Sequence, residues 1–222
     1  MTVGQTARRL LGPRGFSCAS RIYRRVFVDL SKVAAAIGPL ESGARVLDIG
    51  GGDGHLVNRL LELNPGVRVS MLDIASSVGS QVSEAYRDRV ALFPGVSVAE
   101  YARRCPIPPD VILVSDVLHH IPSAGRRSFF EDIRDLMAGH TCRLILKDME
   151  PGHLRTCLSG LADRYVSGDK SVQFPSRRAV TDLVQAVFPG ARCSETDLFC
   201  RDRPNYCLIF TTEAAPPPPG RT

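Results

Sequence analysis

The chain has 222 residues, enough for one domain, and its 44% hydrophobic and 23% charged residues are ordinary for a globular protein. No apolar run approaches the ~18 residues of a membrane-spanning helix, and the apolar run near the N-terminus is too short for a secretory signal. Seven cysteines without a C-x-x-C pair fit neither a disulfide framework nor a zinc site. We therefore expect a cytoplasmic protein with no metal centre and no membrane partner.

The net charge of +5 is concentrated at the front of the chain. Six arginines precede the first acidic residue, Asp29: Arg8, Arg9, Arg14, Arg21, Arg24 and Arg25. Such a cluster can contact nucleic acid or another acidic partner, but it is equally typical of a solvated helix face with a loose tail. We expect the second arrangement, and nucleic acid is not the expected partner.

Residues 1–19 predict a flexible lead-in. Residues 20–38 predict a helix that covers the domain, because apolar residues recur there every three or four positions and Gly38-Pro39 ends the pattern. From residue 44 onward, short β-branched runs alternate with helical patterns. Strands are predicted at 44–50, 67–73, 91–98, 110–116 and 142–148, and helices at 55–63, 76–90, 98–104, 123–139 and 176–188.

The C-terminal third departs from this alternation. Residues 151–175 are longer than a parallel connection needs, so they predict a lid-like insertion. Segments 191–199 and 205–212 predict an antiparallel hairpin, and the proline-rich residues 213–222 predict a disordered tail. Together the elements indicate an α/β domain over 20–212, with a mostly parallel sheet and one antiparallel strand at its end.

The strongest local signal is the run V-L-D-I-G-G-G-D-G-H-L from Val46, where the first strand turns into a helix. Its glycines let the backbone turn tightly and approach a ligand: Gly50, Gly51, Gly52 and Gly54. The carboxylates of Asp48 and Asp53 would repel a pyrophosphate but attract a cationic amine. Asp73, which ends the second strand, is placed to hold a ribose diol. A ribose with a cationic amine and no phosphate fits S-adenosylmethionine better than NAD.

Four motifs resemble the class I S-adenosylmethionine-dependent methyltransferases in order and spacing: VLDIGGGDGHL, MLDI, DVILVSDVLHHIP and LILKDME. The resemblance runs from about residue 44 to 212, and the D-V-L-H-H-I-P segment is more similar to enzymes acting on small molecules than to those acting on DNA. It implies a Rossmann-like, doubly wound sheet of seven strands with an antiparallel C-terminal hairpin strand. It also implies S-adenosylmethionine as the cofactor.

The same resemblance assigns cofactor contacts to particular residues. Asp48 and the backbone of the four glycines would contact the methionine end, Asp73 the ribose and Ile74 the adenine. Asp116, at the end of the fourth strand, would lie beside the cofactor, and Tyr23 on the N-terminal helix would close the site. The family often has an Asp or Asn after the third strand, where Ser97 is the only small polar residue of this chain.

His119 and His120 follow the fourth strand, and Asp148 leaves the fifth, so all three are expected at the edge of the sheet where ligands bind. Transfer of a methyl group to a hydroxyl requires a base, and histidine is the usual one near neutral pH. We therefore expect His119 or His120, oriented by Asp148, to be catalytic. Small-molecule O-methyltransferases, which this chain resembles, use histidines in this segment.

The expected function is O-methylation of a small molecule, of the kind that tailors biosynthetic products. Two alternatives stay open at the level of sequence. One is an RNA or protein acceptor that the N-terminal arginines would grip, and the other is a nucleotide-cofactor-binding module without catalytic activity. Both a monomer and a homodimer are compatible with the sequence.

Overall fold

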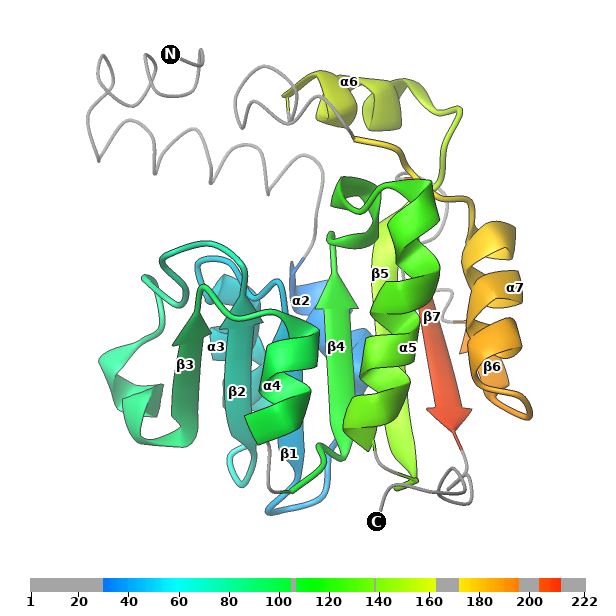
Figure 1. The fold of residues 1–222 in the computed structure, drawn as a ribbon. Helices are drawn as coiled ribbons and strands as arrows, with labels where there is room; N and C mark the ends of the chain where they lie inside the picture. The colour runs from blue at the N-terminus through cyan, green and yellow to red at the C-terminus, as the bar shows by residue number, and fades with distance from the viewer. Residues whose placement is uncertain (1–29, 105–106, 138, 163–171, 196–203, 213–222) are drawn as a thin grey trace.

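The structure is a computed structural model that describes residues 30–104, 107–137, 139–162, 172–195 and 204–212. These residues form a seven-stranded sheet in the order β3-β2-β1-β4-β5-β7-β6 (Figure 1). β7 runs antiparallel to both of its neighbours, and the other pairs are parallel. The strands are β1 (Arg45–Ile49), β2 (Arg68–Asp73), β3 (Val90–Pro94), β4 (Val111–Ser115), β5 (Cys142–Met149), β6 (Arg192–Glu195) and β7 (Asn205–Thr212). The predicted α/β class and mostly parallel sheet are confirmed.

Helices cover both faces of the sheet (Figure 1). They are α2 (Leu30–Ile37), α3 (His55–Leu63), α4 (Val98–Arg104), α5 (Arg126–Met137), α6 (Leu154–Ala162) and α7 (Arg177–Val187). α2 confirms the end of the helix predicted at 20–38, whose beginning lies outside the described residues, as do the predicted lead-in and tail. Within the described part of the chain, no helix is long and apolar enough to cross a membrane.

The central strand β4 is mostly apolar, as expected of a strand that is buried on both faces. Successive side chains of a strand point to opposite faces. Leu47 of β1 therefore packs in the cluster that includes Phe130 of α5 and Val184 of α7. Its neighbour Val46 packs in the second cluster, with Leu60 of α3 and Ile37 of α2. This double burial fixes the ends of the parallel strands, and hence the loops that follow them.

Two sequence predictions about this fold are wrong in detail. The antiparallel strand β7 lies inside the sheet, between β5 and β6, so the edge strand is β6 and not the antiparallel one. The helix predicted at 76–90 is reduced to a 3₁₀ segment, Glu84–Arg89. Its first part is held instead by the glycine loop, since the N–H groups of Gly79 and Gln81 donate to the carbonyls of Gly52 and Asp53, both at 2.8 Å. Gly79 also has a φ of +69°, which a helix does not allow.

Candidate active site

The loops that follow β1, β2, β4 and β5 meet at the carboxyl edge of the sheet, because these four strands are parallel. In open α/β sheets this edge is where ligands bind. The predicted residues of the glycine loop, the second strand end, the histidine pair and Asp148 are all carried by these loops or strand ends. Figure 1 places α6 beyond the same edge.

The glycine loop turns β1 into α3 by hydrogen bonds to the neighbouring strand. The N–H groups of Gly50 and Gly51 donate to the carbonyl of Leu72 at 2.7 and 3.3 Å. A Cβ atom on Gly51 would come within 2.8 Å of the Asp48 carboxylate, so a side chain is excluded there. Gly52 has a φ of +54°, and a Cβ on it would meet only a carbonyl oxygen at 3.8 Å. The loop therefore offers backbone, without side chains, to a ligand.

Asp48 is buried at the start of this loop, and its carboxylate accepts no hydrogen bond from the described residues. Burial raises the pKa of this carboxyl from 3.8 to about 7, and the nearby charge of Asp73 adds to the effect. A buried carboxylate without donors is costly, and a cationic group of a ligand would relieve that cost. The predicted contact of Asp48 with a cationic amine thus has a physical basis in the structure.

Asp73 ends β2 with its carboxylate anchored by two backbone donors. Gly52 donates to it at 3.1 Å and Ala75 at 2.8 Å, one to each oxygen, which leaves further acceptor positions open. Ile74 is 84% exposed and presents an apolar surface beside it. Ser97, by contrast, is used to cap α4, where it and Glu100 exchange hydrogen bonds. Ser97 therefore does not replace the family's polar residue after the third strand.

His119 and Asp148 form a buried pair, as the sequence predicted from their common edge. The Nδ1 atom of His119 lies 2.8 Å from a carboxylate oxygen of Asp148, and the side chains are 5% and 0% exposed. Asp148 also accepts the backbone N–H groups of His119 and Met149. The carboxylate therefore fixes both the ring and the backbone of His119. His120 is exposed, with its ring centroid 4.1 Å from that of His119.

Arg126 was not among the residues predicted for the site, yet its hydrogen bonds hold the histidine loop in place. Its Nε donates to the carbonyls of Leu118 and Ile121, and its Nη2 donates to the carbonyl of Gln173. Gln173 in turn donates its N–H to the carbonyl of His119 at 2.9 Å, and the ring of Phe174 stacks on His119 at 4.7 Å. Burial lowers the pKa of Arg126, an effect that the charge of Asp148 opposes. The arginine appears in sequence as one member of an exposed helix start, without a signal of its role.

Lys147 was also not among the residues predicted for the site. This β5 side chain is fully buried, and its Nζ lies 2.5 Å from a carboxylate oxygen of Asp116. Ligand atoms of Asp116, His119 and Asp148 all lie within 4.8 Å of one another, a grouping that could hold a metal ion. The ammonium of Lys147 and the donors on Asp148 already compensate these carboxylates, so the donor set does not favour a divalent cation.

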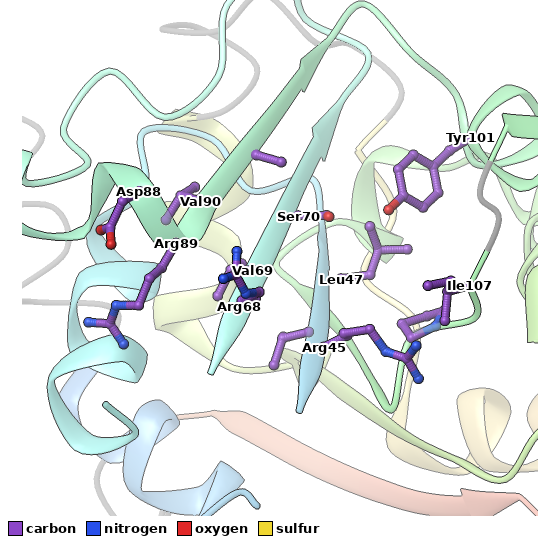
Figure 2. Close-up of a pocket in the computed structure, with 13 residues that line it drawn as sticks. Arg45, Leu47, Arg68, Val69, Ser70, Asp88, Arg89, Val90, Tyr101 and Ile107 are labelled. Atoms are coloured by element: carbon purple, nitrogen blue, oxygen red, sulfur yellow. The ribbon is translucent and has the colours of Figure 1, made fainter. Parts of the chain in front are cut away.

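Other candidates lie away from this edge. Tyr23 and the N-terminal arginines lie outside the described residues. A hollow of about 310 Å³ lies at the opposite, amino edge of the sheet, where the first residues of three strands line it: Arg45, Arg68 and Val90 (Figure 2). None of the residues predicted for the site lines this hollow. The carboxyl edge is therefore the candidate active site.

Comparisons with known proteins agree with this geometry. Residues 47–140 match a family model described as a methyltransferase domain. O-methyltransferase xanE of Aspergillus fumigatus is 29% identical over 116 residues, which are 49% of this chain and 26% of that protein. The mitomycin 7-O-methyltransferase MmcR superposes with a TM-score of 0.67 at 21% identity, over 96% of this chain and 61% of that one.

Human N-acetylserotonin methyltransferase, solved in complex with S-adenosylmethionine, superposes with a TM-score of 0.66 at 17% identity, over 93% of this chain and 58% of that one. This chain thus spans less than two thirds of the length of these relatives. The matched model begins in β1 and includes the glycine loop, Asp73 and the histidine pair. The chain is therefore similar to methyltransferases in sequence over residues 47–140, and it shares the fold of methyltransferases of known structure.

Proposed function

We propose that this protein methylates a hydroxyl oxygen of a small molecule, with S-adenosylmethionine as the methyl donor. The observation that carries the proposal is the buried His119–Asp148 pair, which lies at the same edge of the sheet as the glycine loop. A base held in one orientation is what a hydroxyl acceptor requires and what an already nucleophilic acceptor does not. The printed names of xanE and MmcR, both O-methyltransferases, support oxygen as the methylated atom.

One group of site residues binds the methyl donor, and a second group transfers the proton of the acceptor. Asp48, Asp73, Ile74 and the backbone of the glycine loop bind the donor, which when bound supplies an activated methyl group on a sulfonium. The exposed face of Ile74 offers an apolar wall for the adenine, and the open acceptor positions of Asp73 suit the ribose hydroxyls. Asp116 directly follows β4 and lies at the same edge of the sheet.

His119 takes the acceptor proton in this scheme. Asp148 holds the hydrogen of the neutral imidazole on Nδ1, so the lone pair that accepts a proton is on Nε2. Asp148 then stabilises the imidazolium that forms. His120, whose ring lies beside that of His119, contributes to the acceptor side of the site. A small-molecule acceptor and a cytoplasmic location complete the proposal; the free thiols of Cys142, Cys157, Cys193 and Cys207 fit a reducing compartment.

The test is His119→Ala, assayed as formation of S-adenosylhomocysteine with a panel of hydroxylated small molecules. Turnover should fall by about 10²–10⁴-fold because the base is lost, while calorimetric affinity for S-adenosylhomocysteine stays within about 2-fold. Asp148→Asn should lose turnover to a similar degree, since an amide can hold the ring in the wrong tautomer. Asp135→Asn, on the exposed side of α5, is the matched control. Full activity of His119→Ala would remove the base from the mechanism.

A further inference from the structure

Lys147 is an unusual residue for the interior of a sheet, because its side chain is fully buried near the end of β5. An ammonium in such a place has to be paired, and its pairing with Asp116 at 2.5 Å satisfies this need. A buried ion pair contributes little to stability compared with apolar residues of the same volume. Lys147 lies next to Ser115 at the end of β4, the strand that the histidine pair follows, so its charge is placed at the site.

The partner of Lys147, Asp116, is held in a costly backbone conformation. It has a φ of +58° and is the one non-glycine residue with a positive φ among those that the structure describes. Such conformations persist where the surroundings enforce them, and they cluster at functional sites. Here the backbone N–H of Asp116 donates to the carbonyl of Lys147 at 2.9 Å, so β5 fixes both the main chain and the side chain of Asp116.

The carboxylate of Asp116 keeps acceptor capacity for a ligand. One oxygen accepts from Lys147 and the other from Ser115 at 3.2 Å, whereas a carboxylate offers about four acceptor positions. The side chain is about one third exposed, in contrast to Lys147 behind it. A carboxylate oxygen of Asp116 lies within 4.8 Å of a ring nitrogen of His119. A molecule that places a hydroxyl at His119 therefore brings its neighbouring atoms to Asp116.

We propose that Asp116, oriented by Lys147, selects acceptors that carry a second hydrogen-bond donor, a hydroxyl or amino group, on the carbon next to the methylated hydroxyl. This inference rests on the proposed O-methylation. Two donors on adjacent carbons are close enough to reach two acceptor groups whose ligand atoms lie within 4.8 Å of each other. The reacting hydroxyl gives its proton to His119 as its oxygen forms the bond to the methyl carbon and the carbon–sulfur bond breaks. The second donor keeps its proton, and Asp116 only accepts its hydrogen bond.

The surface beside Asp116 and His119 indicates which carbon skeleton the acceptor has. Phe174, which stacks on His119, also lines a hollow of about 410 Å³ beneath α6, together with Gly160 and Val172. A flat apolar skeleton fits such a wall better than a polar one. Aromatic probes are therefore appropriate: catechol and 2-aminophenol carry the second donor, and phenol lacks it.

The experiment compares kcat/KM for catechol and 2-aminophenol with that for phenol. The native protein should prefer the first two by about 10-fold or more, because a site built to bind a polar hydrogen rejects an analogue without it. Asp116→Asn and Lys147→Met should each remove most of this preference, measured as the ratio of kcat/KM for catechol to kcat/KM for phenol. The double variant should lose no more than either single variant, because the two residues act as one unit. Asp135→Asn should keep the preference.

Calorimetry with S-adenosylhomocysteine separates this inference from the proposed function. Asp116→Asn should bind the compound as the native protein does, within about 2-fold; a loss of 10-fold or more would make Asp116 a cofactor ligand and overturn the inference. Equal use of phenol and catechol, or methylation of neither catechol nor 2-aminophenol, would overturn it too. Failure of the native protein to bind S-adenosylmethionine or S-adenosylhomocysteine would instead overturn the proposed function itself.

Discussion

Asp48 is a carboxyl group whose ionisation the native fold disfavours, since burial raises its pKa from 3.8 to about 7. The native state holds this proton more tightly than the unfolded state does. Its contribution to stability is therefore complete below pH 3.8 and is lost as the pH rises through about 7. The gap corresponds to at most about 4 kcal/mol. A site prepared for a cationic ligand thus destabilises the free protein near neutral pH.

Asp48→Asn should therefore stabilise the ligand-free protein at pH 8, by about 1–4 kcal/mol relative to the native sequence, and should lose this advantage below pH 4. The measurement is urea unfolding of both proteins at pH 4, 6 and 8. The same variant should bind S-adenosylmethionine more weakly, because the cationic amine loses its charged partner. A stability difference that does not change with pH would show that Asp48 is not the titrating group.

Other single residues could not be assigned from the sequence. The strand ends at which His119 and Asp148 lie were predictable from the alternation of strands and helices. Their hydrogen bond joins residues 29 positions apart, however, and depends on the β4–β5 register. Lys147 carries no sequence signal, because a lysine at the end of an apolar run is typical of a strand that emerges into solvent. Its full burial becomes evident only in the folded structure.

At the scale of elements, the strands that are apolar on both faces and the antiparallel C-terminal hairpin were predicted well, whereas the 76–90 segment and the order of the last two strands were not. β4 is a nearly continuous apolar run, so its strand assignment did not depend on context. The 76–90 segment has helical spacing, but its hydrogen bonds to the glycine loop outweigh a weak helical preference. The order of β6 and β7 was not readable, because a hairpin can join a sheet by either of its strands.

We propose that α6, in the segment 151–175 that the sequence predicts to be lid-like, acts as a lid over the acceptor side; residues 163–171 of that segment lie outside the described residues. Within the described part of this segment, α6 stands outside the sheet, and its Leu154 and Leu158 are 77% and 47% exposed. Elements with few buried contacts open at low free energy. Amides of α6 should therefore exchange faster than those of β4 in the free protein, and should slow when S-adenosylhomocysteine and an acceptor are added. Exchange in α6 as slow as in β4, and unchanged by ligands, would contradict a lid.

At the scale of the whole molecule, ligand binding at the site should stabilise the whole fold, because the glycine loop is hydrogen-bonded to Leu72 of β2, a residue of the apolar core. A ligand that binds only the folded state stabilises it by about 2.7 kcal/mol at 100 times its Kd. For a chain of this size, S-adenosylhomocysteine at that concentration should raise the Tm by roughly 5–10 °C. NAD should raise the Tm little, since the carboxylates of Asp48 and Asp53 disfavour a pyrophosphate at the loop.

The variant Asp73→Ala tests whether the rise in Tm caused by S-adenosylhomocysteine depends on the predicted ribose contact. The carboxylate holds the glycine loop through Gly52 and has open acceptor positions, so its loss should weaken cofactor binding by about 1–3 kcal/mol. At one fixed concentration of S-adenosylhomocysteine, 100 times the native Kd, the rise in Tm should then shrink to between about two thirds and about one tenth of the native value. Because the variant also loses two hydrogen bonds of its own, the comparison is between its Tm with and without ligand. A full rise in Tm in Asp73→Ala would place the ribose elsewhere, whereas a larger rise with NAD than with S-adenosylhomocysteine would contradict the assigned cofactor.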